Sequence, residues 1–377
     1  MVKPFNEFIV KIASRCNINC DYCYEYNLGD ENWRSQPVRM AQATLNTLAT
    51  RIVEHCRTHR IEDIFVTFHG GEPLLVGAQA LDEYCATLRR ALEGVCTLNL
   101  GLQTNAILLE PVVIEVIKRW NILVSVSIDG PLAANDRHRV GHRGESSFPA
   151  VMAGIECLKS SAPRQFTGIL AVIDIRNDPI QMFDFLAGFG VELIDFLLPH
   201  HTWDRPPLRP GADPIAYGRW YWRLYQAWIG DRHPDVQIRY LKNIVAQMVG
   251  GQSAVESMTL EPCQLVMIAT DGGIEAVDSL KATASGAQLT GLNILGTRFD
   301  NALSSPIINI RQTGADQLCE TCLNCRNMTA CAGGYFPHRY SKTRGFDNPS
   351  VYCEDLFWLV DQIREHLTGL RKARCPS

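Results

Sequence analysis

Three cysteines within eight residues form the densest group of metal-binding side chains near the start of this chain. Cys16, Cys20 and Cys23 lie in the run SRCNINCDYCYEY, with the spacing C-x3-C-x2-C. A [4Fe–4S] cluster bound entirely by protein uses four cysteines, so three thiolates leave one iron open to a cofactor. Structural zinc sites normally have four ligands, often as two C-x2-4-C pairs, and the spacing here differs from that pattern. The sequence therefore predicts an iron–sulfur cluster with an open iron.

A second group of cysteines lies toward the end of the chain. Cys322, Cys325 and Cys331 follow the spacing C-x2-C-x5-C, and Cys353 comes farther along. Four thiolates in this arrangement can bind either a zinc ion or a fully protein-ligated [4Fe–4S] cluster, and the spacing alone leaves both open. Cys319, three residues before Cys322, is an additional candidate ligand.

Alternating apolar runs and helical patterns predict the elements that position these residues. The apolar runs are 8–14, 64–68, 98–104, 123–129, 167–173 and 193–199, and segments of helical periodicity separate them. Strands that alternate with helices in this order form a parallel sheet with right-handed crossovers. Six such units predict an α/β fold, a partial (β/α)6 TIM-like barrel, whose active site lies at the C-terminal ends of the strands.

Polar residues follow the ends of successive predicted strands. They are Gly70, Gly71 and Glu72 in HGGEP, Asn105 in QTNA, Ser127 in SIDGP and Arg139 in NDRHR. Paired glycines allow close backbone approach to a ligand, a carboxylate accepts hydrogen bonds from an amino group, and an arginine pairs with a carboxylate. Each segment alone is also typical of a turn or of a solvated charged face. Together they indicate a ligand that has an amino group, a carboxylate and a ribose.

These motifs resemble those of the radical S-adenosylmethionine (radical SAM) superfamily. The resemblance implies that Cys16, Cys20 and Cys23 hold the cluster and that its open iron binds the amino and carboxylate groups of S-adenosylmethionine. It implies further cofactor contacts: Tyr22 before the third cysteine, Gly70, Gly71 and Glu72 at the methionine amino group, Ser127 and Arg139 at the ribose and carboxylate, and Asn105 as an addition.

The C-terminal cysteines resemble the SPASM extension of radical enzymes that modify peptides and proteins. The resemblance implies one auxiliary [4Fe–4S] cluster, held by Cys322, Cys325, Cys331 and Cys353. Proteins of this kind with two auxiliary clusters also carry Cys-x9-15-Gly-x4-Cys and a later cysteine. Here Cys263 and Gly273 are present, but Asp278 and Tyr335 stand at the two remaining cysteine positions, which is why we expect a single auxiliary cluster.

Asp278 is a candidate base. The resemblance places it between the barrel and the extension, where a peptide would lie, and an acidic group there can accept the proton lost when a substrate radical is oxidised. An aspartate before Ser279 is also typical of a turn, and the sequence leaves both interpretations open.

A finer resemblance is to peptide maturases that act on FxS-like motifs (FxsB-type). It rests on DSLK (278–281), GGYFPHRY (333–340) and NPSVYCEDL (348–356). It implies that a 5′-deoxyadenosyl radical removes hydrogen from a Cβ of a precursor peptide and that the β-radical attacks an aromatic ring, which gives a C–C crosslink within a three-residue cyclophane. The auxiliary cluster would accept the released electron. A flavodoxin or ferredoxin would supply the reducing electron.

Three other functions stay open. A sulfatase-maturing enzyme shares the architecture, but it normally keeps both auxiliary clusters. A thioether-forming maturase often keeps a free iron in its auxiliary cluster, and four closing cysteines disfavour this. A non-catalytic zinc-binding interaction protein would not need the polar residues at the strand ends.

Composition and length limit the remaining choices. The 377 residues are 46% hydrophobic and 20% charged, with a net charge of −4, which is typical of a globular protein without a polycationic surface for nucleic acid. No signal segment and no run near the ~18 apolar residues of a membrane span are present, so we expect a cytoplasmic protein that binds no membrane.

We expect a radical SAM barrel over 1–200, a helical bridge over 201–260 and a SPASM-type domain over 261–377. A first strand near residue 8 leaves no room for an N-terminal leader-binding module, so we expect leader recognition elsewhere.

Overall fold

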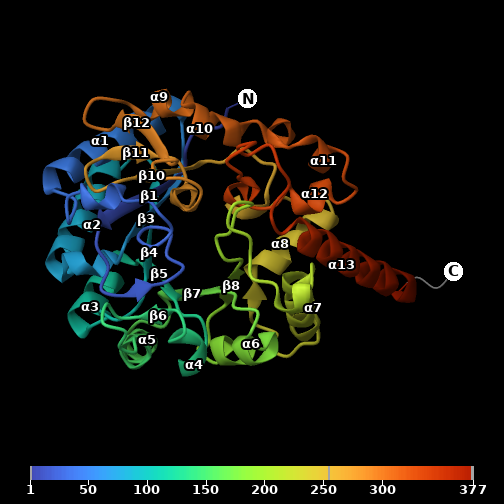
Figure 1. Cartoon of the computed structure of the whole chain (residues 1–377). Coiled ribbons are helices and arrows are strands. Elements are labelled where there is room, and N and C mark those ends of the chain that lie inside the picture. The colour runs from blue at the N-terminus through green and yellow to red at the C-terminus, as the bar shows by residue number, and fades with distance from the viewer. Residues whose placement is uncertain (1, 254, 375–377) are drawn as a thin grey trace. The chain divides into compact units, whose positions relative to one another are not determined.

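The computed structural model describes residues 2–253 and 255–374, with side chains through residue 370. The chain forms two compact units (Figure 1). The first comprises Met1–Leu170 and Cys263–Gln312, and the second comprises Ala171–Pro262 and Thr313–Ser377. These units divide the chain differently from the predicted boundaries at 200 and 260, and the functional division into three domains stays a prediction. Each unit is described by itself.

The first unit is built on a sheet dominated by parallel strands. Its strand order is β12-β11-β10-β1-β3-β4-β5-β7. The strands are β1 (Glu7–Ala13), β3 (Asp63–Gly70), β4 (Thr97–Thr104), β5 (Leu123–Ser127), β7 (Phe166–Val172), β10 (Leu265–Ile268), β11 (Gly273–Glu275) and β12 (Leu289–Asn293). All neighbours from β10 to β7 pair in parallel, and β11 and β12 add antiparallel strands at one edge. This mixed α/β fold is consistent with the predicted partial barrel.

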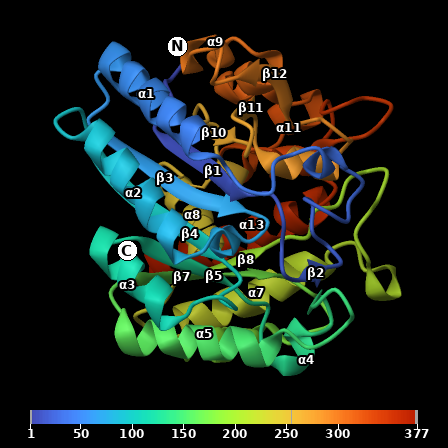
Figure 2. The same ribbon diagram turned by 90° about the vertical axis from the view of Figure 1, so that its left-hand side faces the viewer.

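Helices cover one face of this sheet. They include α1 (Gln42–His59), α2 (Ala78–Leu92), α3 (Pro111–Trp120) and α5 (Phe148–Ser161), with the short α4 (Leu132–Asn135), α9 (Phe299–Leu303) and α10 (Pro306–Asn309). Figures 1 and 2 show α1, α2, α3 and α5 along the outside of β1, β3, β4 and β5. Proline at the first helical position of α3 and a left-handed Asn121 after its last residue account for its bounds.

Alternation along the strands separates an apolar face from a polar face. On β1 and β3, Phe8, Val10, Val66 and Phe68 are fully buried. Successive side chains of a strand point to opposite faces, so the residues between these face the other way. That second face carries polar side chains, including Lys11, His69, Gln103 and Ser127. The sheet therefore buries its helix-facing side and presents chemistry-bearing residues on the other.

Residues 263–312 return to the first unit. β10 pairs in parallel with β1, with Glu7 opposite Leu265 and Val10 opposite Ile268. This strand lies within the predicted SPASM-type domain, 261–377, and it covers the edge that β1 would otherwise leave with unpaired backbone groups. Asp278 begins a short 3-10 helix, Asp278–Ala282, directly after this hairpin.

The second unit is mostly helical. It contains α6 (Pro179–Ala187), β8 (Leu193–Leu197), α7 (Ala216–Ile229), β9 (Gln237–Ile238), α8 (Arg239–Met248), α11 (Glu320–Leu323), α12 (Met328–Cys331) and α13 (Cys353–Arg374). The aromatic stripe of α7 is core, because Tyr217, Trp220, Tyr221 and Tyr225 are all buried. Within the described residues, no helix combines the length and the apolar character needed to cross a membrane.

Candidate functional site

The three-cysteine loop follows β1 and is held by its own backbone. The Cys23 amide donates to the Cys20 carbonyl at 3.0 Å, and the Asn27 amide donates to the Cys23 carbonyl at 2.8 Å. Cys20 lies in the two-residue strand β2 (Asn19–Cys20), which pairs with β6 (Arg139–Val140). The loop therefore holds Cys20 and Cys23 in one turn, and β6 brings Arg139 directly opposite Cys20.

Burial keeps these thiols protonated while no metal is bound. It raises the pKa of Cys16 to about 12 and also raises the pKa values of Cys20 and Cys23. Such thiols are poor nucleophiles but can ligate a metal, whose binding releases the protons. This behaviour fits three cluster ligands better than a reactive catalytic cysteine.

Glu72 joins the ends of two neighbouring strands. Its side chain is fully buried and accepts hydrogen bonds from the Leu74 amide at 3.0 Å, the Thr104 hydroxyl at 2.7 Å and the Asn105 amide at 2.8 Å. The Asn105 side chain donates to Asn17 Oδ1 at 2.7 Å and lies 3.9 Å from Cys16 Sγ. The structure thus connects the GGEP segment, the end of β4 and the cysteine loop through one buried carboxylate.

The two glycines of GGEP are needed for packing within the protein. A Cβ on Gly70, whose φ is +146°, would lie 2.0 Å from the Ala13 carbonyl oxygen. A Cβ on Gly71 would lie 1.9 Å from the Tyr26 hydroxyl and 2.4 Å from the Arg15 carbonyl oxygen. The sequence predicted that these glycines make room for a ligand. The structure adds a second reason, because the backbone after β1 already occupies the space that side chains would take.

Arg139 and Tyr22 form a second polar group beside the cysteine loop. Arg139 Nη1 donates to the Tyr22 hydroxyl at 2.9 Å, and that hydroxyl donates to Asp129 Oδ2 at 2.6 Å. Arg139 Nε is buried and has no hydrogen-bond partner among the described residues. The guanidinium therefore keeps a donor for a ligand acceptor. Ser127, at the end of β5, accepts a hydrogen bond from Gln103 Nε2 at 2.7 Å.

Asp278 lies in a buried polar group rather than in an exposed turn. The Tyr24 hydroxyl donates to its Oδ2 at 3.0 Å, and Lys11 Nζ lies 3.7 Å from the same oxygen. Burial alone would raise the pKa of Asp278, but the positive charges of Lys11 and Lys281, the nearby His69 and the Tyr24 hydrogen bond bring it below its ordinary value. The carboxylate is thus held in its ionised form.

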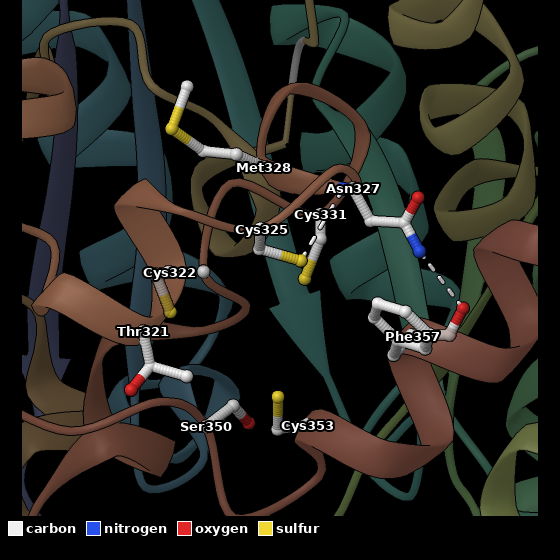
Figure 3. A pocket seen from close by; sticks show the side chains of 10 residues that line it. Thr321, Cys322, Cys325, Asn327, Met328, Cys331, Ser350, Cys353 and Phe357 are labelled. Carbon is white, nitrogen blue, oxygen red and sulfur yellow. Dashed lines mark hydrogen bonds between the residues drawn. The ribbon is translucent and has the colours of Figure 1, made fainter.

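The C-terminal thiols line one cavity of the second unit (Figure 3). The cavity has a volume of about 240 Å³, and its lining includes Cys322, Cys325, Cys331 and Cys353 together with Met328. Figure 3 shows the four sulfur atoms pointing toward one another from α11, α12, the intervening loop and the start of α13. Burial raises the pKa of Cys331 to about 12 and that of Cys353 to about 11, so these thiols also carry protons in the absence of metal.

Two further cysteines lie apart from this cavity lining. Cys319 is buried beside Leu318 and Cys322, and Leu260 and Met328 pack against this small core. Cys263 belongs to the first unit, where its amide donates to the Arg311 carbonyl at 3.0 Å. Cys319 thus has both apolar neighbours and a cavity-lining thiol, Cys322, next to it, and its role as a ligand stays a prediction.

Sequence reasoning missed the polar partners of the predicted residues. Thr104, Asn17, Asp129 and Tyr24 each bind a predicted site residue directly. One signal was available, because Lys11 interrupts the apolar run FIVKIA, and a lysine in a buried strand requires an acidic partner. The identity of that partner depends on contacts between distant segments.

Residues 10–186 match the family model of the radical SAM superfamily. The serine-type anaerobic sulfatase-maturating enzyme of Bacteroides thetaiotaomicron is 22% identical over 396 residues, which cover 98% of this chain and 92% of that enzyme. The match over residues 10–186 agrees with the superfamily predicted from the sequence motifs, and that superfamily implies a [4Fe–4S] cluster and S-adenosylmethionine.

Two solved structures share this fold. The structure of anSMEcpe with bound AdoMet and Cp18Cys peptide has a TM-score of 0.83 at 19% identity, covering 98% of this chain and 99% of that one. Streptococcus suis SuiB bound to its precursor peptide SuiA has a TM-score of 0.60 at 15% identity, covering 94% of this chain and 77% of that one. Both neighbours are peptide complexes, and at these identities the likeness is one of fold.

Proposed function

Because residues 10–186 form a radical SAM domain, we propose that this chain is a radical SAM enzyme that modifies a peptide or protein substrate. The observation that carries the proposal is the convergence of four thiols on one cavity in a chain that also has the open three-cysteine loop. An enzyme that only generates the radical needs only the three-cysteine loop. A second thiol-lined site supports an enzyme that must also remove an electron from its product.

The first unit supplies the ligands for the radical-generating centre. Cys16, Cys20 and Cys23 would hold the [4Fe–4S] cluster. When bound, the cluster and S-adenosylmethionine supply the 5′-deoxyadenosyl radical that removes hydrogen from the substrate. The protein's part is to orient these groups. Asn105, anchored by Glu72, lies beside Cys16, and Arg139 lies opposite Cys20.

The cofactor-binding residues keep their predicted assignments as part of the proposal. The buried Glu72 carboxylate would bind the methionine amino group with Gly70 and Gly71 beside it. Arg139 would pair with the carboxylate through donors that Tyr22 does not occupy. Ser127 would contact the ribose.

The second unit would hold an auxiliary [4Fe–4S] cluster through Cys322, Cys325, Cys331 and Cys353. Zinc–sulfur bonds of about 2.3 Å place any two sulfurs of one zinc ion within about 4.6 Å of each other. Among the described residues, the one group of three histidine, cysteine or acidic ligand atoms within 4.8 Å is His55, His59 and Asp300. No three of the described rear thiols therefore form the compact group that one zinc ion requires. This spacing and the cavity volume support a cluster.

The substrate proposal is a ribosomally made precursor peptide in which an aromatic ring becomes linked to a Cβ. Asp278 would accept the proton that leaves when the product radical is oxidised, and a flavodoxin or ferredoxin would supply the reducing electron.

Sulfatase maturation is the second candidate. It is favoured by similarity to sulfatase-maturating enzymes over 98% of the chain. Thioether formation on a cysteine donor would use the same radical.

One competition experiment separates these substrates. The anaerobically reconstituted chain is incubated with S-adenosylmethionine, a reductant and either a precursor peptide encoded beside it or a sulfatase-derived peptide containing serine or cysteine. The crosslink proposal expects mass spectra in which the precursor peptide loses two hydrogen atoms and no longer fragments between the linked residues. Turnover of the sulfatase peptide alone would establish the second candidate instead.

Metal analysis tests the non-enzymatic alternative. Two clusters require about eight irons per chain. Zinc in place of iron, with no 5′-deoxyadenosine formed on reduction with S-adenosylmethionine, would identify a zinc-binding interaction protein.

A further inference from the structure

Two thiols of the first unit lie together at the end of the sheet opposite the three-cysteine loop. Cys56 is in the last turn of α1, and Cys96 directly precedes β4. Their sulfur atoms are 3.8 Å apart and share a hydrogen bond. Cys96 comes before the start of β4, whereas Asn105 follows its end. The pair is therefore separate from the residues assigned to the cluster and the cofactor.

Backbone hydrogen bonds fix the two segments that carry these thiols. The Thr97 amide donates to the Glu62 carbonyl at 2.7 Å. The Ile61 amide donates to the Cys56 carbonyl at 3.0 Å. A disulfide bond is about 2 Å long, so each sulfur needs to move by only about 0.9 Å for one to form. Rotation of the two side chains supplies a movement of this size while both backbone segments keep their places.

The two thiols differ in their access to solvent. Cys56 is 1% exposed, whereas Cys96 is half-buried and lines a groove of about 620 Å³ together with Arg89, Arg90 and Trp120. A dissolved reagent can therefore reach Cys96 but not Cys56. In such a pair the accessible sulfur reacts first, and the buried sulfur attacks it afterwards.

The hydrogen bond between the thiols also favours Cys96 as the first to react. Burial raises the pKa of both thiols, to about 12 for Cys56. The hydrogen bond with Cys56 partly offsets this rise in the pKa of Cys96, because it stabilises the Cys96 thiolate. The thiolate is the form that attacks a disulfide. Since both pKa values are above the ordinary value, exchange at neutral pH is slow, which distinguishes this pair from an activated catalytic cysteine.

We propose that Cys56 and Cys96 are a reversible redox site, which a small disulfide such as oxidised glutathione converts into an intramolecular disulfide. The Cys96 thiolate attacks one sulfur of the reagent, whose sulfur–sulfur bond breaks and releases one glutathione thiolate. Cys56 then attacks Cys96 Sγ, and the second glutathione leaves. The protons of the two protein thiols pass to these two leaving groups. The chain is thus oxidised by two electrons, and the reagent is reduced to two thiols.

This inference goes beyond the proposed function and is tested independently of it. Both thiols lie at the end of the sheet away from the cysteine loop, so the disulfide forms whether or not the chain modifies a peptide. The new bond joins the end of α1 to the start of β4 across 40 positions. A link of this kind stabilises a fold mainly by restricting the unfolded chain.

Peptide mapping of the oxidised chain tests the assignment. The full chain is reconstituted with iron and sulfide and incubated anaerobically with oxidised glutathione, and its remaining thiols are alkylated before digestion. We expect a disulfide-linked pair of peptides containing Cys56 and Cys96, with glutathione on neither. In Cys56→Ser the second step is impossible, so Cys96 keeps one glutathione per chain. A wild-type chain that keeps glutathione on Cys96, or leaves Cys96 unreacted, overturns the proposal.

A stability measurement provides the second readout. Oxidised wild type unfolds at a higher urea concentration than reduced wild type, and dithiothreitol reverses the shift. Cys96→Ser shows no shift with the same reagent. Cys157→Ser, which removes a half-buried thiol of α5, is the control and keeps both the shift and the disulfide-linked peptides. A disulfide that dithiothreitol does not reduce in the folded chain would contradict a reversible site.

Discussion

At the scale of single residues, Cys319 differs from the other rear cysteines because it does not line the cavity. Cys331 lines the cavity, whereas Cys319 lies in a small core with Leu318. We expect Cys331→Ala to lose about four irons per chain, one cluster, and Cys319→Ala to keep the full complement. Iron analysis and the visible absorption of reconstituted protein measure this difference. Equal iron loss in both variants would make Cys319 a ligand.

The predicted site residues were visible in the sequence because each belongs to a short motif. Their partners were not, because they come from distant segments. Tyr24 meets Asp278 across 254 positions, and Glu72 meets Asn105 across 33. The reason for the second glycine of GGEP was equally hidden. Gly71 is needed because the chain after β1 passes next to it, and only the packed structure reveals that approach.

At the scale of elements, α5 packs so closely against the loop after β4 that replacing one helical glycine, Gly154, is costly. A Cβ on Gly154 would lie 1.9 Å from the carbonyl oxygen of Ala106, next to Asn105. Backbone must therefore shift, and we expect Gly154→Ala to lower the free energy of unfolding by about 1–3 kcal/mol and to weaken S-adenosylmethionine binding. Urea unfolding and equilibrium dialysis measure the two effects.

The control for that variant is a glycine in a helix with open space around it. Gly369 in α13 has nothing within 4 Å of its Cβ position. We expect Gly369→Ala to leave cofactor binding unchanged and to raise stability by at most about 1 kcal/mol. A Gly154→Ala chain as stable as wild type would show that α5 can move away from the Asn105 loop at little cost.

Helix α6 and the loop after α7 are joined by an ion pair that predicts a pH dependence. Arg232 donates to both carboxylate oxygens of Asp184 at 2.5 and 2.6 Å, and these bonds lower the Asp184 pKa to about 2. Because the folded pKa is below the unfolded value, the pair stabilises the fold at neutral pH, and this contribution is lost as the pH falls through about 2.

We therefore expect Asp184→Asn to be less stable than wild type at neutral pH and equally stable at the acid end. Unfolding in urea at a series of pH values checks this expectation. Exposed Asp235, which forms no ion pair among the described residues, provides the control as Asp235→Asn. A constant gap between Asp184→Asn and wild type across the series would contradict an ionic origin.

The main elements were predictable because apolar spacing and strand–helix alternation are local properties. The predicted strand 64–68 became β3 over Asp63–Gly70, and 98–104 became β4 over Thr97–Thr104. The placement of 263–312 was not predictable in this way. The apolar run of β10 predicts a strand but does not indicate its neighbour. Its pairing with β1 depends on which edge of the sheet is open in the folded chain.

At the scale of the whole molecule, the two compact units contain separate thiol sites. Cys16, Cys20 and Cys23 belong to the first unit, and the thiols of the 240 Å³ cavity belong to the second. Each set of ligands comes from a single unit, so each site depends on the folding of its own unit. Loss of one centre should leave the other intact.

This separation predicts that radical formation and the final oxidation to product can be uncoupled. Radical formation requires the residues of the first unit, whereas the final oxidation requires an electron acceptor, which we assign to the second. We expect Cys353→Ala to keep forming 5′-deoxyadenosine but to lose crosslinked product, and Cys16→Ala to lose both. Chromatography of the nucleoside and mass spectrometry of the peptide measure the two outputs in the same reaction. Normal product from Cys353→Ala, with its iron reduced by about four per chain, would rule out the rear cluster as the electron acceptor.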